Sequence, residues 1–237
     1  MDSTNNQSTT SILGVAVRDL NRLRQVTTTV VRHGFGELVL RSPLSKLLFK
    51  DRQLPEPDEE LRKAPAALRF KRLLESLGPT YIKLGQVLST RPDLLPRDYI
   101  EELKNLQDNA PELPFDTIKQ VVEDALGASL EATFADFDPK ILGTASIAQT
   151  HLARTHEGER VVVKVQRPGI EKIMRGDLDL LYLGAKILEA TIEEVDIYSP
   201  SDIVTEFEKA LMQELNFNFE LSNLQTRVTA SKPLEKS

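Results

Sequence analysis

The sequence predicts an α+β protein that is mostly helical, with helices packed on one small antiparallel sheet. Three observations predict this fold class. Along most of the first 138 residues, apolar side chains recur every three or four positions, which is the period of an amphipathic helix. Residues 141–166 change to short runs that are rich in β-branched residues and separated by turns. Two longer stretches with a helical period then follow.

The composition is that of an ordinary soluble protein. Of the 237 residues, 40% are apolar and 28% are charged, and no run of about 18 apolar residues predicts a membrane-spanning helix. Cysteine is absent, which excludes disulfides, thiol nucleophiles and cysteine metal sites. The three histidines lack the spacing of a metal motif, and the N-terminus lacks the order of a signal peptide. We expect a cytoplasmic protein with no nucleic-acid partner.

The N-terminal residues divide into a polar tail and a basic leader. Residues 1–10 are polar and are predicted to be disordered. Residues 11–52 contain eight Lys or Arg against three acids, a net charge of +5, which leaves −10 for residues 53–237 after Asp2. The leader, residues 11–57, is interpreted as an amphipathic helix and a linker. Its charge indicates a contact with anionic lipid or an acidic partner, although a solvated helix face explains it equally well.

Residues 58–138 are predicted to form a helical extension. Gly78 is placed as a helix stop, and Pro79 suits the first turn of the next helix. Asp116 is the expected cap of a later helix, which Gly127 ends. The helices expected here span residues 61–77, 80–89, 93–106 and 117–126, with short helical pieces running on to Phe137.

Residues 139–230 are predicted to hold the sheet and two long helices, and residues 231–237 to form a tail. Three runs favour strands because they are rich in β-branched residues and bounded by turn signals. The expected segments are two strands within 141–153, a turn at 156–159, a strand at 160–166 and helices at about 170–191 and 201–228.

A lysine inside the third strand is the first candidate for chemistry. Lys164 stands in the run Val-Val-Val-Lys-Val, where burying its charge without an anionic partner is costly. In kinases the partners are the ATP phosphates and a helix glutamate, and Glu220 on the last helix is the candidate for that glutamate. A lysine on an edge strand that reaches solvent explains the same pattern.

The small-residue loop and a Lys/Gln pair are the other candidates. The run Gly-Thr-Ala-Ser that ends at Ser146 is neither a Walker A loop nor a Gly-rich kinase loop, but its small residues let backbone amides approach phosphate. Lys83 and Gln86 are three positions apart, so both project from one helix face. Glu214 is a candidate to face Lys83. A plain hairpin turn and solvated helix faces explain these residues as well.

Taken together, these residues resemble the N-terminal part of the UbiB/AarF/ADCK family of atypical kinases. The resemblance keeps the order and spacing of the family over roughly residues 60–225. The stretches that carry it are Leu77–Pro96, Tyr99–Ala110, Ala145–His151, Val162–Ile170 and Asp177–Leu180. It implies that the sheet is the start of an incomplete protein-kinase-like N-lobe, with the helical extension packed on it.

The resemblance assigns nucleotide binding to the sheet. Lys164 corresponds to the nucleotide-binding strand lysine, and Glu220 to the glutamate that pairs with it. The residues that correspond to the family's Ala-rich loop are Gly143, Thr144, Ala145 and Ser146. Members of this family bind ATP with Mg²⁺, act as ATPases or unorthodox kinases, and support ubiquinone or related isoprenoid-lipid biosynthesis at a membrane.

The resemblance assigns regulation to the extension. Lys83 and Gln86 correspond to the KxGQ motif, which lies over the active site in the family and restrains protein-kinase activity. Glu214 and Asn216 stand at the ExD motif, which contacts the KxGQ helix and the metal–nucleotide site. Asn216 replaces the aspartate of that motif, which removes a carboxylate from the metal contact. The Ala-rich loop also departs from the family pattern, because it starts with Gly-Thr. The glycine gives the backbone more conformational freedom at the first position, and the threonine has a bulkier side chain at the second.

The family's catalytic-loop Asp and Asn, and its metal-binding Asp-Phe-Gly aspartate, have no counterparts in these residues. The prediction is a truncated, ATP-binding member without kinase or ATPase activity of its own. Its expected partners are the nucleotide, a complementary catalytic half, and an isoprenoid lipid or the inner membrane surface, where it is peripheral. The alternative is a non-catalytic module that binds a partner protein or a membrane. A third hypothesis, an unrelated helical scaffold, requires the strand triplet to be absent.

Overall fold

The fold class is the one that the sequence predicts: helices and one three-stranded antiparallel sheet. The computed structural model describes residues 20–42, 48, 55–56, 58–107, 110–191 and 199–215. Contacts divide the chain into two units, the first ending at Asp177 and the second starting at Leu178. Because the strand triplet is present, the hypothesis of an unrelated helical scaffold is wrong.

A glycine separates the first helices that the structure describes. Helix α2, Leu20–Val30, runs into the π-helical turn η1, Val31–Phe35, and α3 follows at Gly36–Arg41. Gly34 has φ +82° inside η1, a backbone conformation that side chains with a Cβ rarely adopt. Gly34 therefore interrupts the regular helix, whereas Gly36 has φ −61° and starts the next helix.

The helical extension packs through a glycine on α7. The helices are α5, Glu59–Lys63; α6, Ala66–Leu77; α7, Pro79–Leu88; and α8, Arg97–Leu103. Gly78 ends α6 with φ +100°, which confirms the predicted stop, and Pro79 opens α7. A Cβ on Gly85 would lie 2.4 Å from Cδ1 of Leu106 and 2.7 Å from Cδ1 of Leu74. Only glycine lets α7 approach its neighbours this closely.

The sheet is a meander of three strands. Strand β1 spans Asp136–Thr144, β2 spans Ala148–Arg154 and β3 spans Arg160–Gln166, in the order β1-β2-β3. The β2–β3 register is regular and pairs Thr150 with Lys164, whereas the β1–β2 register shifts between Phe137 and Ile141 and again before Gly143. Such shifts are β-bulges, which bend the bulged strand.

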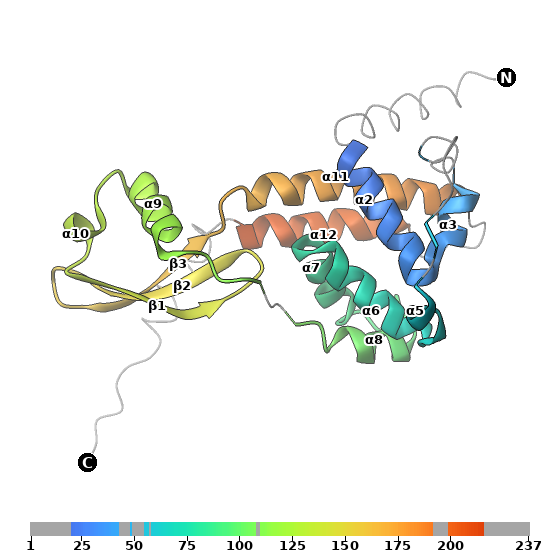
Figure 1. Ribbon diagram of the computed structural model, residues 1–237, viewed down its shortest axis with the longest axis horizontal. Coiled ribbons are helices and arrows are strands. Elements are labelled where there is room, and N and C mark those ends of the chain that lie inside the picture. The colour runs from blue at the N-terminus through green and yellow to red at the C-terminus, as the bar shows by residue number, and fades with distance from the viewer. Residues whose placement is uncertain are drawn as a thin grey trace, which may run out of the picture. The chain divides into compact units, whose positions relative to one another are not determined.

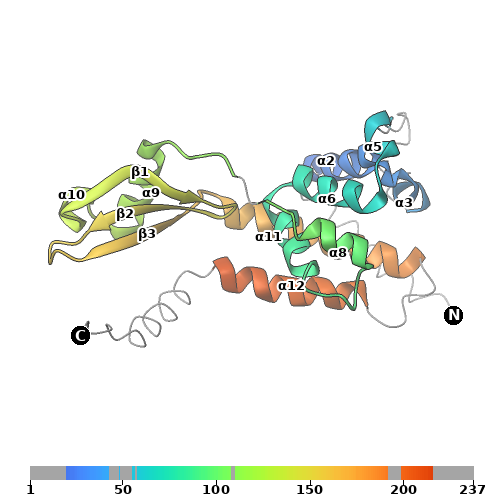
Figure 2. The ribbon, with the colours of Figure 1, turned by 90° about the horizontal axis from the view of Figure 1, so that it is seen from below.

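One face of the sheet is covered by α9, Phe115–Leu126, and the short α10, Leu130–Thr133 (Figure 1 and Figure 2). The core between them contains residues of both helices and of β3: Ile118, Val122, Leu130 and Val165, with Leu113, Phe115, Val121, Phe134, Phe137 and Val163 packed around them. Gly127 ends α9 in the left-handed conformation, φ +67°, as predicted.

The second unit holds the later part of α11, Ile170–Thr191, and α12, Pro200–Leu215, which form an antiparallel hairpin (Figure 1 and Figure 2). Tyr182 donates its hydroxyl to Oε2 of Glu208 at 2.7 Å. Glu189 accepts from the hydroxyl of Ser199 and from the backbone N–H of Ser201, and the Ser199 hydroxyl bond is the main cause that holds the pKa of Glu189 below its usual range.

Four local predictions are wrong. The helix expected at 61–77 is interrupted at Ala64 and Pro65, between α5 and α6, because proline has no N–H to donate within a continuous helix. Strand β1 begins at Asp136, where short helical pieces were expected to run on to Phe137; Pro139 is tolerated within it because β1 is an edge strand. The N-cap of α9 is Pro114, and Asp116 lies in its first turn instead. Helix α8 is shorter than 93–106, because it starts only after Pro96 and gives way to turns after Leu103.

Candidate functional site

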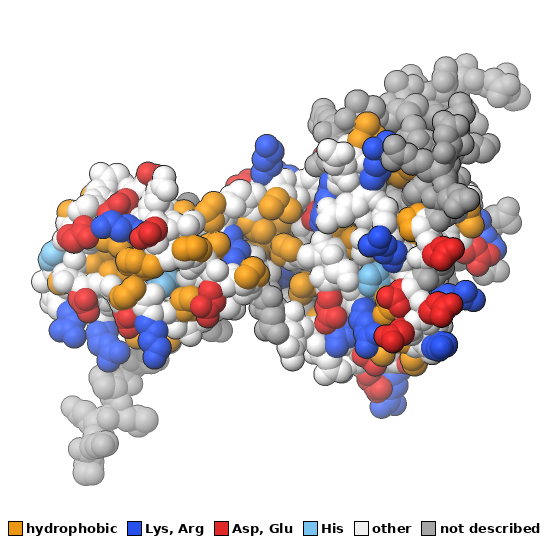
Figure 3. All heavy atoms as spheres, viewed as in Figure 1, with side chains coloured by type: hydrophobic (Ala, Val, Ile, Leu, Met, Phe, Trp, Pro, Cys, Tyr) orange, Lys and Arg blue, Asp and Glu red, His pale blue; other side chains and the backbone are white. Residues whose placement is uncertain are grey.

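The strand lysine lies on the sheet face opposite α9. Side chains alternate along β3, and Val163 and Val165 belong to the core under α9. Lys164 therefore shares the other face with Val162, which is 58% exposed. Lys164 itself is half-buried, with Thr150 directly opposite on β2. This face therefore combines a cation with an exposed apolar side chain. On the side that Figure 3 views, hydrophobic and charged side chains both lie at the surface of the part that contains the sheet.

The small-residue loop, residues 143–146, belongs to the hairpin turn between β1 and β2, close to Thr150, the residue that pairs with Lys164. The N–H of Ala145 donates to the carbonyl of Ala148 at 2.8 Å, and Ser146 is only 3% exposed. The hydroxyl of Thr150 donates to the carbonyl of Gly143 at 3.1 Å, where a Cβ on Gly143 would come within 3.3 Å of that hydroxyl. Gly143 does not have positive φ. The glycine therefore makes room for Thr150 instead of supplying unusual backbone freedom.

The hydroxyl of Thr144, predicted to bind nucleotide, has two protein partners. It donates to the carbonyl of Ala110 at 3.3 Å and accepts from Nη2 of Arg167 at 2.7 Å. Arg167 was not among the predicted site residues, although a cation placed directly after a strand and before Pro-Gly is a visible signal. Thr144 and Arg167 thus connect the loop to the segment that precedes α9.

Two buried polar side chains on β2 hold that same segment. Gln149 is fully buried; its Oε1 accepts from the N–H of Leu113 at 2.8 Å and its Nε2 donates to the carbonyl of Leu113 at 3.3 Å. The same Nε2 lies 3.1 Å from Nε2 of the fully buried His151, whose Nδ1 lies 3.0 Å from the carbonyl of Asp138. Because an amide nitrogen donates, Nε2 of His151 is the acceptor in this contact. The amide of Gln149 thus pairs with Leu113 as a neighbouring strand would.

The KxGQ residues lie on helix α7 of the first unit. Lys83 and Gln86 are both half-buried, while Leu84 and Gly85 between them are buried. Gly85 packs against Leu74 of α6 and Leu103 of α8. The motif therefore has a packed side and a partly exposed side, and Lys83 and Gln86 belong to the latter. Glu214 lies on α12, in the second unit, and is half-buried as well. Its predicted pairing with Lys83 stays a prediction.

A buried ion pair anchors the start of α7, and no predicted site residue pointed to it. Asp177 is fully buried and accepts from Arg22, with Nε–Oδ1 2.7 Å and Nη2–Oδ2 3.0 Å, and from the hydroxyl of Thr80 at 2.7 Å. Arg22 also donates to the carbonyl of Leu77 at 2.7 Å and lies over the Tyr81 ring. Burial, with a smaller contribution from the Asp177 carboxylate, raises the pKa of Tyr81 well above its usual value.

Two predicted residues, Glu220 and Asn216, lie outside the described residues, so the Lys164–Glu220 pair stays a prediction. Within the described part of the chain, no three His, Asp or Glu side chains gather in a way that could hold a metal ion. The helices described here also include none with the length and apolar character needed to cross a membrane.

Similar proteins agree with the expected family. The ABC1 atypical kinase-like domain matches residues 105–234. A "Probable protein kinase UbiB" of Azotobacter vinelandii is 39% identical over 213 residues, which are 86% of this chain and 39% of that protein. A protein of the same name from Marinobacter nauticus is 44% identical over 155 residues, covering 65% of this chain and 28% of that protein.

A solved structure, the complex of Rv3197 with erythromycin from Mycobacterium tuberculosis, is also similar. It is 29% identical, with a TM-score of 0.36, over 56% of this chain and 34% of that one. The chain thus spans well under half the length of the relatives that it matches.

Proposed function

Because the chain belongs to the UbiB/AarF/ADCK family of ABC1-type atypical kinases, we propose that it forms the phosphate-binding side of an ATP site. The observation that carries the proposal is the position of Lys164 on the sheet face opposite α9, beside the exposed Val162. A lysine in this place attracts the α- and β-phosphates, and the apolar neighbour suits the face of an adenine base.

The loop that ends at Ser146 supports the same proposal. Its turn joins β1 to β2, and Thr150, two residues beyond the turn, stands opposite Lys164 in the register. Small side chains in such a turn let backbone N–H groups come near a phosphate. The proposal assigns Gly143, Thr144, Ala145 and Ser146 to the loop that frames the phosphates. Of these, Thr144 contributes by holding the loop in place through its hydrogen bonds to Ala110 and Arg167.

The proposal separates nucleotide binding from catalysis. The family implies ATP with Mg²⁺, which neutralises phosphate charge when bound, but the described residues offer no carboxylate cluster for the ion. Phosphoryl transfer needs metal ligands and a group that orients the nucleophile. We assign these groups to the length of the family that this chain does not cover. The chain by itself is therefore proposed to bind ATP without turning it over.

Calorimetry with the purified chain tests the proposal. ATP is titrated into the wild type, Lys164→Ala and Lys104→Ala, with and without Mg²⁺. Since bonds to a charged group contribute about 1.5–3 kcal/mol, Lys164→Ala should weaken ATP binding by about 10- to 100-fold. Lys104 is an exposed lysine that follows α8, and its variant should bind as the wild type does.

Three outcomes would contradict the proposal. Equal affinities in Lys164→Ala and Lys104→Ala would remove the lysine from the site. Steady release of phosphate from ATP that is lost in Lys164→Ala would show that the chain is catalytically sufficient. A folded wild type that binds no ATP would favour the alternative, a non-catalytic interaction module that uses the exposed face around Val162 and Leu142.

A second part of the proposal is that the protein works at a membrane surface in isoprenoid-lipid biosynthesis. The resemblance implies a role in ubiquinone or related isoprenoid-lipid biosynthesis at a membrane surface, and the net positive charge of residues 11–52 supports contact with anionic lipid. Sedimentation with vesicles that contain anionic lipid tests this part. Binding that is absent on neutral vesicles and falls as salt rises is expected, and equal binding to both kinds of vesicle would contradict it.

A further inference from the structure

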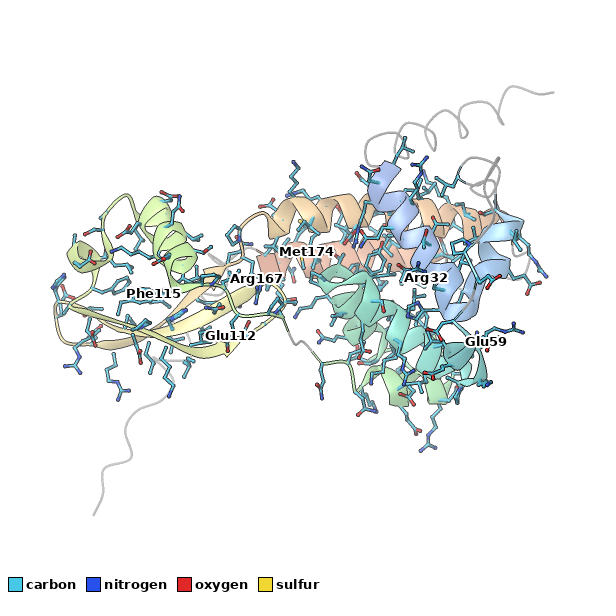
Figure 4. The ribbon with its side chains drawn as sticks, viewed as in Figure 1. Arg32, Glu59, Glu112, Phe115, Arg167 and Met174 are labelled. Atoms are coloured by element: carbon cyan, nitrogen blue, oxygen red, sulfur yellow. The ribbon has the colours of Figure 1, made fainter. Side chains whose placement is uncertain are left out.

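One arginine, Arg167, holds the proposed phosphate-binding loop in place through hydrogen bonds. Arg167 directly follows β3, at the junction of β3 and α11 (Figure 4). Its Nε donates to the carbonyl of Ala145 at 2.9 Å, and its Nη2 donates to the hydroxyl of Thr144 at 2.7 Å. Its backbone N–H donates to the carbonyl of Ile147 at 2.9 Å. Main chain and side chain of one residue thus contact three of the four residues from 144 to 147.

The same guanidinium reaches a second segment. Nη2 also donates to the carbonyl of Pro111 at 2.7 Å, in the stretch between the helical extension and α9. Thr144 bonds to Ala110 in that stretch, and Gln149 holds Leu113 two residues beyond Pro111. The loop, the end of β3 and residues 110–113 are therefore one hydrogen-bonded group.

The chemistry of these bonds requires arginine in particular. Its planar fork presents several N–H groups in fixed directions, so two nitrogens serve three acceptors at once. A lysine ammonium carries the same charge on a flexible stem and does not reproduce this fork. Because the Ala145 carbonyl is fixed by Arg167 and its N–H by Ala148, the peptide planes of the turn have little freedom to rotate.

We infer that Arg167 is a positioning residue for nucleotide binding: it holds the turn 144–147 in one conformation and couples that conformation to residues 110–113. The side chain of Arg167 donates to acceptors of the protein itself, so its effect on nucleotide affinity is indirect and acts through the conformation of the loop. This inference rests on the proposed function, since it is the phosphates of ATP that meet the loop. It also gives residues 110–113 a means to influence the ATP site.

Amide hydrogen exchange tests the structural half without any nucleotide. Arg167→Ala should speed exchange at residues 144–148 and at residues 112 and 113 relative to the wild type, while the β2–β3 amides keep their protection. Arg160→Ala is the matched control, an exposed arginine at the other end of β3. If exchange in Arg167→Ala equals that in Arg160→Ala, the inference is overturned whether or not ATP binds.

Ligand titrations test the functional half. In Arg167→Ala, affinity for ATP and ADP should fall on the order of tenfold, while affinity for adenosine stays unchanged because it lacks phosphates. General misfolding would weaken all three ligands. Thr144→Val should cause part of the same loss, and it should add nothing in the Arg167→Ala background because both changes break one network.

Arg167→Lys separates geometry from charge. The inference predicts that this variant stays close to Arg167→Ala in both exchange and ATP affinity; full recovery would overturn it in favour of a purely electrostatic role. Equal loss of adenosine and ATP would overturn it as well. If the wild type binds no ATP, the proposed function fails, and faster loop exchange in Arg167→Ala would still support the positioning role.

Discussion

Arg22 and Asp177 are 155 positions apart and form a two-point ion pair, with Nε 2.7 Å from Oδ1 and Nη2 3.0 Å from Oδ2. The carboxylate is fully buried and the arginine side chain is 19% exposed. Thr80 shares the carboxylate, so the pair joins α2 and α11 at the first turn of the KxGQ helix α7. The basic leader is thus in part a structural element of the extension.

Arg22→Ala should lower the free energy of unfolding by about 3–5 kcal/mol, because the Asp177 carboxylate is left buried without its cation. Chemical denaturation followed by circular dichroism measures the change. Arg24→Ala is the matched control on the same helix, since Arg24 is exposed. It should stay within about 0.5 kcal/mol of the wild type. Equal effects of the two substitutions would show that the ion pair does not anchor α2.

The glycine of the KxGQ motif should resist even the smallest enlargement. Gly85→Ala places a Cβ 2.4 Å from Leu106 and 2.7 Å from Leu74, and overpacking of this kind costs about 1–3 kcal/mol. Gly184→Ala is the control, because a Cβ there meets no atom within 4 Å. It should stabilise helix α11 by about 0.5–1 kcal/mol. Thermal melts compare the two, and a Gly85→Ala protein as stable as Gly184→Ala would refute the close packing.

Alkaline pH should destabilise the protein through Tyr81. Its pKa is raised in the folded state, chiefly by burial, so above about pH 10 the unfolded chain releases a proton that the folded chain keeps. The free energy of unfolding is therefore unaffected by this group below pH 10 and falls as pH rises toward the folded-state pKa.

Tyr81→Phe tests this pH dependence. The hydroxyl of Tyr81 is buried without a hydrogen-bond partner among the described residues, so its removal should change stability at pH 7 by no more than about 1 kcal/mol. The slope of stability against pH should become shallower above pH 10. An unchanged slope in denaturation series at pH 8–11 would argue against a buried, neutral Tyr81.

Removal of the Gln149 amide should loosen the segment before α9. Gln149→Ala leaves the N–H and carbonyl of Leu113 without partners and should cost about 1–3 kcal/mol of unfolding free energy. Amide exchange at Leu113 should rise at the same time. Gln120→Ala, an exposed position on α9, is the control and should change neither quantity. An unaltered Leu113 amide in Gln149→Ala would contradict the strand-like pairing.

Local rules predicted much of the fold because the signals lie within a few residues. The stops at Gly78 and Gly127 were readable from glycine and the periodicity around it, and both have positive φ. The early start of β1 was hidden because Pro139 and Asp138 favour a turn locally. Aromatic packing of Phe137 against Phe115 and Phe134 stabilises the strand there instead.

The candidate site also contains residues that local sequence signals reveal and residues that they do not. Lys164 and the small-residue loop could be found because strand alternation and a family motif mark them. The contacts of Arg22 with Asp177, and of Arg167 with Pro111, join residues that are 155 and 56 positions apart. Neither contact has a local pattern in the sequence, since each depends on how separate helices and strands come together.

The most direct test of the ATP site is a map of amide chemical shifts during titration of the isotope-labelled chain with ATP. We predict shifts centred on Lys164, Val162 and residues 143–148, with the α9 residues that cover the opposite face unaffected. Shifts centred on α9, or none at all at saturating ATP, would contradict the assignment of this sheet face to nucleotide.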